Sequence, residues 1–316
     1  MPFIKGNRFY NYPDEPSHFS FGDLFKTASS SLLRKIMQPK QIEKKLNKHI
    51  LTSQQPLITW LGHATFLIQT QCATVITDPV LDSPSMLLQR LIDPYHIEAL
   101  PPIDFIIISH NHRDHLDLKS IELLKKHNPH IKILLPFGDA RYFDSSTTKT
   151  VEHAWWQTTQ YNTIGFTFLP ARHWSQRTPF DYNKSLWGSW MIQDDNHTIY
   201  FAGDSAYDDH FVTIAHHYPT IDCALLPIGP CEPRALLKDV HMNAEEAGQA
   251  FIDLRANSCI PMHWGTFLLG DTHIDAPIKR FITWWNETYT SVIDTKKLYL
   301  PSSGSSITLV ASIAQK

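Results

Sequence analysis

Three histidines and an aspartate lie within the six residues HNHRDH, positions 110–115. They follow directly on the apolar run FIIIS, which is typical of a buried strand. Imidazole and carboxylate groups bind zinc, or iron and manganese, in sites that keep a position open for water. On a loop that leaves a strand, His110 and His112 can point one way while Asp114 and His115 point to a second site. The spacing therefore predicts part of a metal site at the end of a strand.

The same pattern, a buried strand followed by a metal-type ligand, recurs three times further along the chain. His173 follows GFTFLPAR, Asp204 follows TIYFAG, and His263 follows SCIPM. Strand ends on one edge of a sheet lie close together, so these residues could meet at one mouth. Seven candidate ligands are too many for one tetrahedral ion, but they fit two ions that share a bridging carboxylate. Two ions about 3.5–4 Å apart can hold a hydroxide between them.

The elements that must position these residues form two groups of strands, each followed by helices. Paired strands are predicted within 57–80, buried strands within 104–109, 131–136, 221–229 and 258–264, and a hairpin over 185–203. Helices are predicted over 120–127, 243–254 and 276–289, the second opening with Asn243 and Glu246 in a capping-box pattern. This order favours an α/β fold, a four-layer αββα sandwich, over a single doubly wound sheet.

Length and charge suggest one enzyme-sized domain with a basic extension. The 316 residues divide into a partly helical extension, 1–50, and a body, 51–316. Residues 24–50 carry seven Lys and Arg side chains against one Glu, and they hint at peripheral contact with an anionic membrane. A helix docked on the body with its lysines in water is the alternative.

Several functional classes are disfavoured by what the sequence lacks. It contains no Gly-rich phosphate loop, which argues against ATP and NAD. The net charge of −3 argues against nucleic acid as a partner. The start has no apolar secretory region and the four cysteines form no C-x-x-C pair, so a cytoplasmic protein is expected, with membrane association on the cytoplasmic face left open.

The metal motif and its surroundings carry a family resemblance. HNHRDH with the later His, Asp and His resembles the metallo-β-lactamase superfamily of hydrolases. The stretches WLGHATFLIQ, TDPVL, LPARHWSQRTPFDYNKSLWGSW, YFAGDSAYDDHF, LLPIGPCEPR, HMNAEEA and MHWGTF resemble the N-acyl-phosphatidylethanolamine-hydrolysing phospholipase D family and its bacterial relatives. The resemblance covers about residues 56–270 and implies the metallo-β-lactamase fold.

Carried over residue by residue, the resemblance implies two Zn²⁺ ions per chain, with iron or manganese as alternatives. One ion would be held by His110, His112 and His173. The other would be held by Asp114, His115 and His263, with Asp204 bridging both. The candidate catalytic residues are Asp114 and His241. His241 matches a family histidine beside the scissile phosphate.

Four further residues are candidates for a supporting role or for the pocket. Asp78, at the end of the strand TVITD, is expected to orient a ligand imidazole. His63 either supports a ligand or packs in its strand. Trp174 and Arg177 either line the substrate pocket or belong to the packed core.

The expected function is that of a dinuclear zinc phosphodiesterase of phospholipase D type. Its substrate would be N-acyl-phosphatidylethanolamine or a related phospholipid, attacked at phosphorus by a hydroxide held between the ions. One alternative is a hydrolase of the same fold that acts on a small soluble ester, lactone or phosphodiester. Another is a catalytically idle metal-binding scaffold, although the complete ligand set argues against it. The resemblance also suggests a homodimer.

Overall fold

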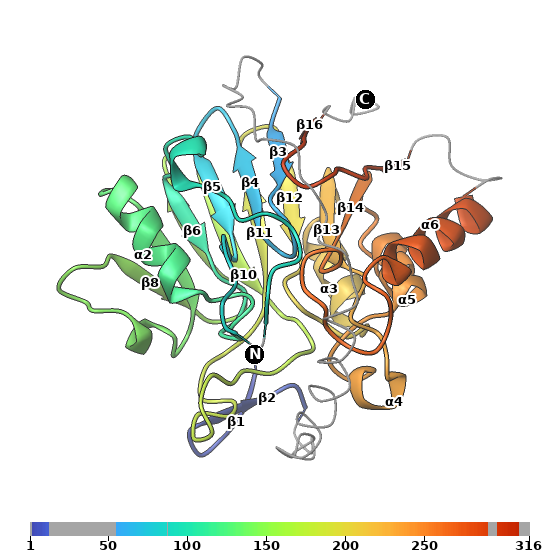
Figure 1. The fold of residues 1–316 in the computed structure, drawn as a ribbon, viewed down its shortest axis with the longest axis horizontal. Coiled ribbons are helices and arrows are strands. Elements are labelled where there is room, and N and C mark those ends of the chain that lie inside the picture. The colour runs from blue at the N-terminus through green and yellow to red at the C-terminus, as the bar shows by residue number, and fades with distance from the viewer. Residues whose placement is uncertain (1, 13–54, 87, 290–295, 310–316) are drawn as a thin grey trace.

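Two seven-stranded sheets share one apolar core in the computed structural model, which describes residues 2–12, 55–86, 88–289 and 296–309 (Figure 1). The first sheet has the order β16 (Ser306–Thr308), β3 (Leu57–Trp60), β4 (Phe66–Gln69), β5 (Thr74–Thr77), β6 (Phe105–Ile107), β7 (Lys132–Pro136) and β8 (Thr150–His153). The second has the order β15 (Lys297–Leu298), β14 (Ser258–Met262), β13 (Cys223–Pro227), β12 (Thr198–Phe201), β11 (Ser189–Gln193), β10 (Ile164–Leu169) and β9 (Gln157–Tyr161).

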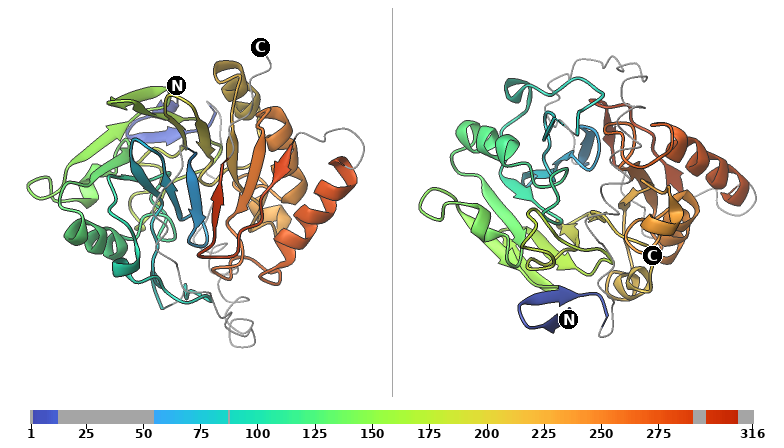
Figure 2. Two further views of the ribbon diagram at one scale, coloured as in Figure 1. Left: turned by 90° about the horizontal axis from the view of Figure 1, so that it is seen from above. Right: turned by 60° about the horizontal axis from the view of Figure 1, so that its bottom comes forward.

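Helices lie outside both sheets (Figure 2). The helices of the described residues are α2 (Leu118–His127), α3 (His210–His217), α4 (Arg234–Leu237), α5 (Ala244–Asp253) and α6 (Ala276–Tyr289), with short 3₁₀ turns η1 (Ile97–Ala99) and η2 (Ala140–Tyr142). A separate hairpin, β1 (Phe3–Lys5) and β2 (Arg8–Tyr10), precedes the sheets in the chain. The predicted four-layer α/β sandwich is confirmed.

Strand β6 shows why the chain forms layers. Phe105 and Ile107 are buried in the core shared with the second sheet, whereas Ile106 packs in a separate core with Ile121 and Leu124 of α2. Successive side chains of a strand point to opposite faces, so an uninterrupted apolar run needs cover on both sides. Helix α2 supplies that cover on the outer face of the first sheet.

The outer face of the second sheet is covered by α5 and α6 (Figures 1 and 2). Helix α5 begins with the predicted capping box: the Asn243 side chain accepts from the Glu246 backbone N–H, and the Glu246 carboxylate accepts from the Asn243 N–H. Phe251 of α5 and Trp285 of α6 pack with their ring centroids 5.1 Å apart. The capping box thus fixes the start of α5, and the apolar faces of α5 and α6 pack on the second sheet.

The strand directions bring the carboxyl ends of eight strands to one edge. Strands β5, β6 and β7 are mutually parallel, and so are β12, β13 and β14. Strand β3 runs in the direction of β5, and β10 in the direction of β12, because each pair is separated by one antiparallel neighbour. The carboxyl ends of all these strands therefore lie at the same edge of their sheet.

Some elements were not expected from the sequence. Strands β8 and β9 and the β1–β2 hairpin carry polar or exposed residues that lack a clear alternation. The predicted hairpin over 185–203 is confirmed as the antiparallel pair β11 and β12. The basic segment 24–50 lies outside the described residues, so its helix and its membrane contact stay predictions. No helix within the described ranges has both the length and the apolar character needed to cross a membrane.

Candidate metal centre

All the sequence-predicted ligands lie together at the common edge of the two sheets. His63 follows β3, Asp78 follows β5, the HNHRDH loop follows β6, His173 follows β10, Asp204 follows β12 and His263 follows β14. The two sheets approach closely at this edge: Gly203 has φ +59°, and a Cβ atom on it would lie 2.4 Å from Ser109 Cβ. Only glycine allows that approach without a shift, and it places Asp204 beside His110.

The first cluster consists of His110, His112 and His173. His110 Nε2 lies 2.8 Å from His112 Nδ1, and His173 Nε2 lies 3.2 Å from the same atom. The outward nitrogens of two of these rings have other partners: His110 Nδ1 is 2.9 Å from Ser109 Oγ, and His173 Nδ1 donates to the Val240 carbonyl at 2.8 Å. These contacts leave the inward nitrogens as lone-pair donors that face one another.

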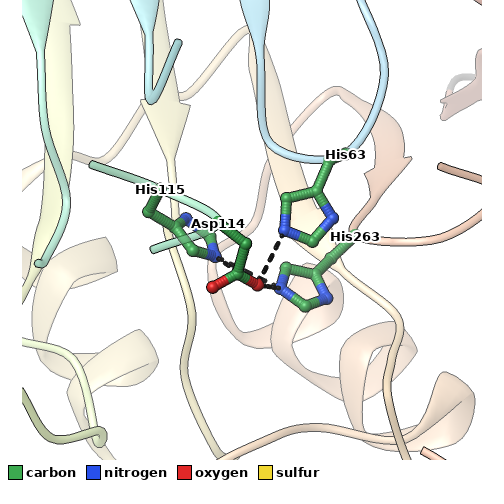
Figure 3. A group of neighbouring side chains, drawn as sticks. All are labelled: His63, Asp114, His115 and His263. Carbon is green, nitrogen blue, oxygen red and sulfur yellow. Dashed lines mark hydrogen bonds and ion pairs between the residues drawn. The ribbon is translucent and has the colours of Figure 1, made fainter. Parts of the chain in front are cut away.

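The second cluster consists of His63, Asp114, His115 and His263 (Figure 3). His115 Nε2 and His263 Nε2 are 3.2 Å apart, and each is 3.8 Å from Asp114 Oδ2. His63 Nε2 lies 3.1 Å from the same carboxylate oxygen. His63 therefore faces the cluster through Asp114, instead of packing only within its strand.

Asp204 lies between the two clusters. Its Oδ2 atom is 3.1 Å from His115 Nε2, 3.8 Å from His110 Nε2 and 3.9 Å from His173 Nε2. Its Oδ1 atom is 3.1 Å from His263 Nε2. One carboxylate thus reaches members of both clusters, as a bridging ligand would.

The first cluster is held in the neutral form that metals require. Burial lowers the pKa of His112 to about 3 and that of His173 to about 4, and it lowers the pKa of His110 well below its usual value. Protons therefore compete weakly with a metal ion for these nitrogens near neutral pH.

The second cluster and Asp204 have a different charge pattern. Burial alone would lower the pKa of His115, but Asp204 and Asp114 raise it well above the usual value. Burial alone would raise the pKa of Asp204, but His115 and His263 hold it well below the usual value. The pKa of Asp114 is likewise lowered, chiefly by His115 and His63 acting against burial. Both carboxylates are therefore ionised near neutral pH.

Asp78 lies behind the ligands, where the sequence placed it. Its Oδ2 atom accepts a hydrogen bond from His115 Nδ1 at 2.7 Å, and its Oδ1 atom accepts the Ser109 backbone N–H at 2.7 Å. A carboxylate on the outer nitrogen fixes the tautomer and the ring orientation of an imidazole ligand. His115 consequently presents Nε2 to Asp204.

A cleft of about 380 Å³ opens over both clusters. Its lining includes His112, Asp114, Asp204, His241 and His263, together with Arg113, Trp174, Gln176, Arg177, Thr178, Pro179, Pro230, Leu237, Val240 and Leu269. Half-buried His241 places Nδ1 3.8 Å from Asp204 Oδ2, and this buried nitrogen has no hydrogen-bond partner within the described part of the chain. Burial lowers the pKa of His241 well below its usual value, so the ring is neutral.

Trp174 and Arg177 both line this cleft, and both also contact the metal loop. The Trp174 ring packs edge-on to His112, with centroids 4.4 Å apart. The Arg177 guanidinium donates to the backbone carbonyls of Asn111 at 3.0 Å and Leu116 at 2.6 Å. Arg177 therefore braces the loop that carries His112, Asp114 and His115, and this brace occupies one of its guanidinium nitrogens.

The donor set fits divalent metal ions. His112 Nδ1 lies 2.8 Å and 3.2 Å from the other two inward nitrogens, which approaches the separation of about 3.3 Å expected for tetrahedral ligands about 2.0–2.1 Å from zinc. A carboxylate that reaches both clusters suits a pair of ions. Apart from the shared Asp204, the implied family ligand sets match two of the four groups of possible metal ligands among the described residues, with His63 added to the second.

Sequence reasoning missed several contacts that hold this centre. Ser109 and Val240 hold ligand rings, Asn11 hydrogen-bonds the backbone of His173, and buried Asp139 accepts from Asn111 inside the metal loop. Ser109 borders the motif and could have been considered from its position. The other three contacts join residues far apart in the chain, so no local pattern indicates them.

Comparison with known proteins points to one group. The chain matches the model of the beta-lactamase superfamily domain over residues 73–264. It is 35% identical over 232 residues to a Caenorhabditis elegans protein named N-acyl-phosphatidylethanolamine-hydrolyzing phospholipase D 1, covering 68% of this chain and 65% of the relative. It is 33% identical over 234 residues to the mitochondrial protein of the same activity name from Saccharomyces cerevisiae, covering 69% and 49%.

The chain thus spans just under two thirds of the worm relative and about half of the yeast relative. Among solved structures it is similar to Igni18, a metallo hydrolase from Ignicoccus hospitalis, with a TM-score of 0.63 and 19% sequence identity. That similarity covers 82% of this chain and 100% of Igni18, and it supports the fold.

Proposed function

Because the chain belongs to the beta-lactamase superfamily and is a metal-dependent hydrolase, we propose that it is a dinuclear zinc phosphodiesterase of phospholipase D type. The observation that supports this most is the cleft, which combines the two ligand clusters with an apolar wall. Pro230, Leu237, Val240 and Leu269 line it together with the cationic Arg113. A phosphodiester that carries an apolar chain would fit such a lining.

The proposed substrate is N-acyl-phosphatidylethanolamine or a related phospholipid. Two relatives with about one third sequence identity carry that activity in their names. In the proposed reaction the oxygen of water bonds to phosphorus, the bond from phosphorus to the ethanolamine oxygen breaks, and phosphatidic acid and an N-acylethanolamine are released.

The residues that would hold the ions are His110, His112 and His173 in the first cluster and Asp114, His115 and His263 in the second, with Asp204 shared. Bound ions would lower the pKa of a water molecule and offset the charge that develops on the phosphoryl oxygens. Zinc is proposed, and iron and manganese suit the same donors.

The protein's own groups have separate tasks in this proposal. His241 faces the cleft beside Asp204 as a neutral imidazole with a buried Nδ1 that lacks a partner among the described residues, so it can hydrogen-bond a phosphoryl oxygen. Asp114 is kept ionised by His115 and His63. Trp174 and Arg177 hold the geometry of the metal loop.

The direct test is incubation of the purified, metal-loaded protein with liposomes of N-acyl-phosphatidylethanolamine, followed by detection of phosphatidic acid. We expect phosphatidic acid to form, and His241→Gln to slow its formation by roughly 100–1,000-fold with unchanged metal content. Asp204→Asn provides an inactive control.

A small soluble substrate is the second candidate, because a cleft of about 380 Å³ is also the size of a small-molecule site. If the protein forms no phosphatidic acid but cleaves a soluble phosphodiester, ester or lactone, the phospholipid assignment is wrong and this second candidate replaces it. A cytoplasmic location, peripheral membrane contact through residues 24–50, the absence of a nucleic-acid partner and a homodimer remain proposals.

A further inference from the structure

The N-terminal hairpin β1–β2 is followed by Asn11, whose side chain contacts a ligand of the first cluster 162 positions away. Asn11 Nδ2 donates to the His173 carbonyl at 3.0 Å, and the His173 backbone N–H donates to Asn11 Oδ1 at 3.3 Å. One side-chain amide therefore pairs with both backbone polar groups of a metal ligand, as a neighbouring strand would.

The orientation of the Asn11 amide is set by a third contact. The buried Trp187 donates from Nε1 to Asn11 Oδ1 at 3.0 Å and to the Ala171 carbonyl at 3.1 Å. Asn11 Oδ1 thus accepts from two N–H groups, and its NH₂ group must face the His173 carbonyl. If the amide were flipped, its NH₂ group would face the N–H donors of His173 and Trp187.

The ring of His173 is held from the other side by its donation to the Val240 carbonyl at 2.8 Å. With the backbone paired to Asn11 and the ring paired to Val240, the position of Nε2 has little freedom. That atom faces His112 Nδ1 at 3.2 Å. The two contacts together define where the third nitrogen of the first cluster lies.

The hairpin lies beside the segment that follows β10 (Figures 1 and 2). Its backbone and side chains are anchored to that segment. The Arg8 guanidinium donates to the Tyr182 carbonyl, and the Phe9 N–H donates to the Asn183 carbonyl at 2.8 Å. Phe9 is buried and packs edge-on to Phe137. The β1–β2 hairpin therefore holds Asn11 in a fixed position.

We propose that Asn11 is a positioning residue for metal binding, acting through the backbone of His173, and that the N-terminal hairpin is part of the metal centre. The inference rests on the proposed two-ion centre but does not depend on the identity of the substrate. Removing a group that orients a ligand typically weakens metal affinity about 10–100-fold. The loss should fall on the first cluster alone, because none of the contacts described for Asn11 reaches a residue of the second.

The test isolates each cluster by variants of the full chain. Zn²⁺ affinity is measured by competition with a chromophoric chelator in a His263→Asn background, which leaves the first cluster intact, and in a His112→Ala background, which leaves the second. Asparagine is chosen at position 263 because His263 has a φ of +64°. Asn11→Ala is placed in each background. Asn11→Asp is the second variant, since it keeps the size and the oxygen that accepts from His173 and Trp187 but replaces the NH₂ donor to the His173 carbonyl with a second oxygen. Ile4→Ala, an exposed side chain of the same hairpin, is the matched control.

We expect Asn11→Ala to weaken Zn²⁺ binding at least about tenfold in the His263→Asn background and less than about twofold in the His112→Ala background. Asn11→Asp should lose affinity with the same selectivity, because a carboxylate oxygen then faces the His173 carbonyl, and it decides the matter if Asn11→Ala does not fold. Equal losses in both backgrounds would mean that Asn11 stabilises the fold only. Affinities for Asn11→Asp that match Ile4→Ala in both backgrounds would also overturn the proposal.

Discussion

The two halves of the metal centre are built from different chemistry. The first cluster is three imidazoles with lowered pKa values, held by a hydroxyl, a backbone carbonyl and the N-terminal hairpin. The second contains Asp114 and a His115 whose pKa is raised by Asp114 and Asp204. The first half is therefore ready to bind an ion near neutral pH, whereas binding at the second must displace a proton from His115.

Asp204 links these unlike halves, so its removal should have the largest effect. Asp204→Asn keeps the shape of the side chain but removes the charge that reaches both clusters. We expect the variant to lose most of its bound metal and at least about 1,000-fold in activity, equivalent to roughly 4 kcal/mol. Metal analysis and turnover measurements check this, and retained activity would show that the bridge is misplaced.

Single ligand losses should separate the halves. We expect His112→Ala to lose the ion of the first cluster and His263→Asn to lose that of the second, each variant keeping about one ion per chain because the other cluster is intact. Metal content after dialysis is the measurement. If either variant keeps two ions or loses both, the clusters do not bind as separate halves.

Substitution of His63 should weaken metal binding at the second cluster alone. Its φ of +54° is tolerated by asparagine better than by alanine, so His63→Asn keeps the backbone while it shortens the partner of Asp114. We expect a loss of about 10–100-fold in Zn²⁺ affinity at the second cluster, as for other groups that orient a ligand. An equal loss at the first cluster, measured in a His263→Asn background, would contradict this role.

Much of the site could be predicted because ligand chemistry coincides with strand ends. The run FIIIS marks a strand covered on both faces, and HNHRDH follows directly where that strand ends, so the local pattern and the ligand chemistry indicate the same site. The sandwich follows from the same apolar runs, each of which needs cover on two sides. Sequence alone also indicated the outer carboxylate Asp78.

The remaining parts depend on long-range contacts that leave no local pattern. The Asn11 side chain hydrogen-bonds the backbone N–H and carbonyl of His173, and any sequence around His173 would offer these two groups. Arg177 is typical of a substrate-binding side chain, yet its guanidinium donates to two carbonyls of the metal loop. The polar strands β8 and β9 lack alternation, so only their neighbours in the sheets define them.

The smallest expected effect concerns stability without metal. His63, His110, His112 and His173 have pKa values lowered by burial, so below about pH 6.5 the unfolded chain binds protons that the folded chain does not. Stability of the metal-free chain should therefore fall as the pH decreases from 6.5 toward 4. The raised pKa of His115 acts oppositely, but its contribution is already complete below pH 6.5.

His112→Ala removes one of these four groups. Its stability should decline less steeply between pH 6 and 5, by at most about 1.4 kcal/mol per pH unit. Urea unfolding of the two metal-free proteins measures the difference. Identical slopes would mean that His112 takes up a proton in the folded chain as readily as in the unfolded one.

The most direct test of the two-part centre is an anomalous difference map of zinc-loaded crystals, recorded at the zinc edge. We expect two peaks about 3.5–4 Å apart, one against His110, His112 and His173 and the other against Asp114, His115 and His263, with Asp204 between them. A single peak, or a second peak away from these residues, would contradict the assignment of two ions to two clusters.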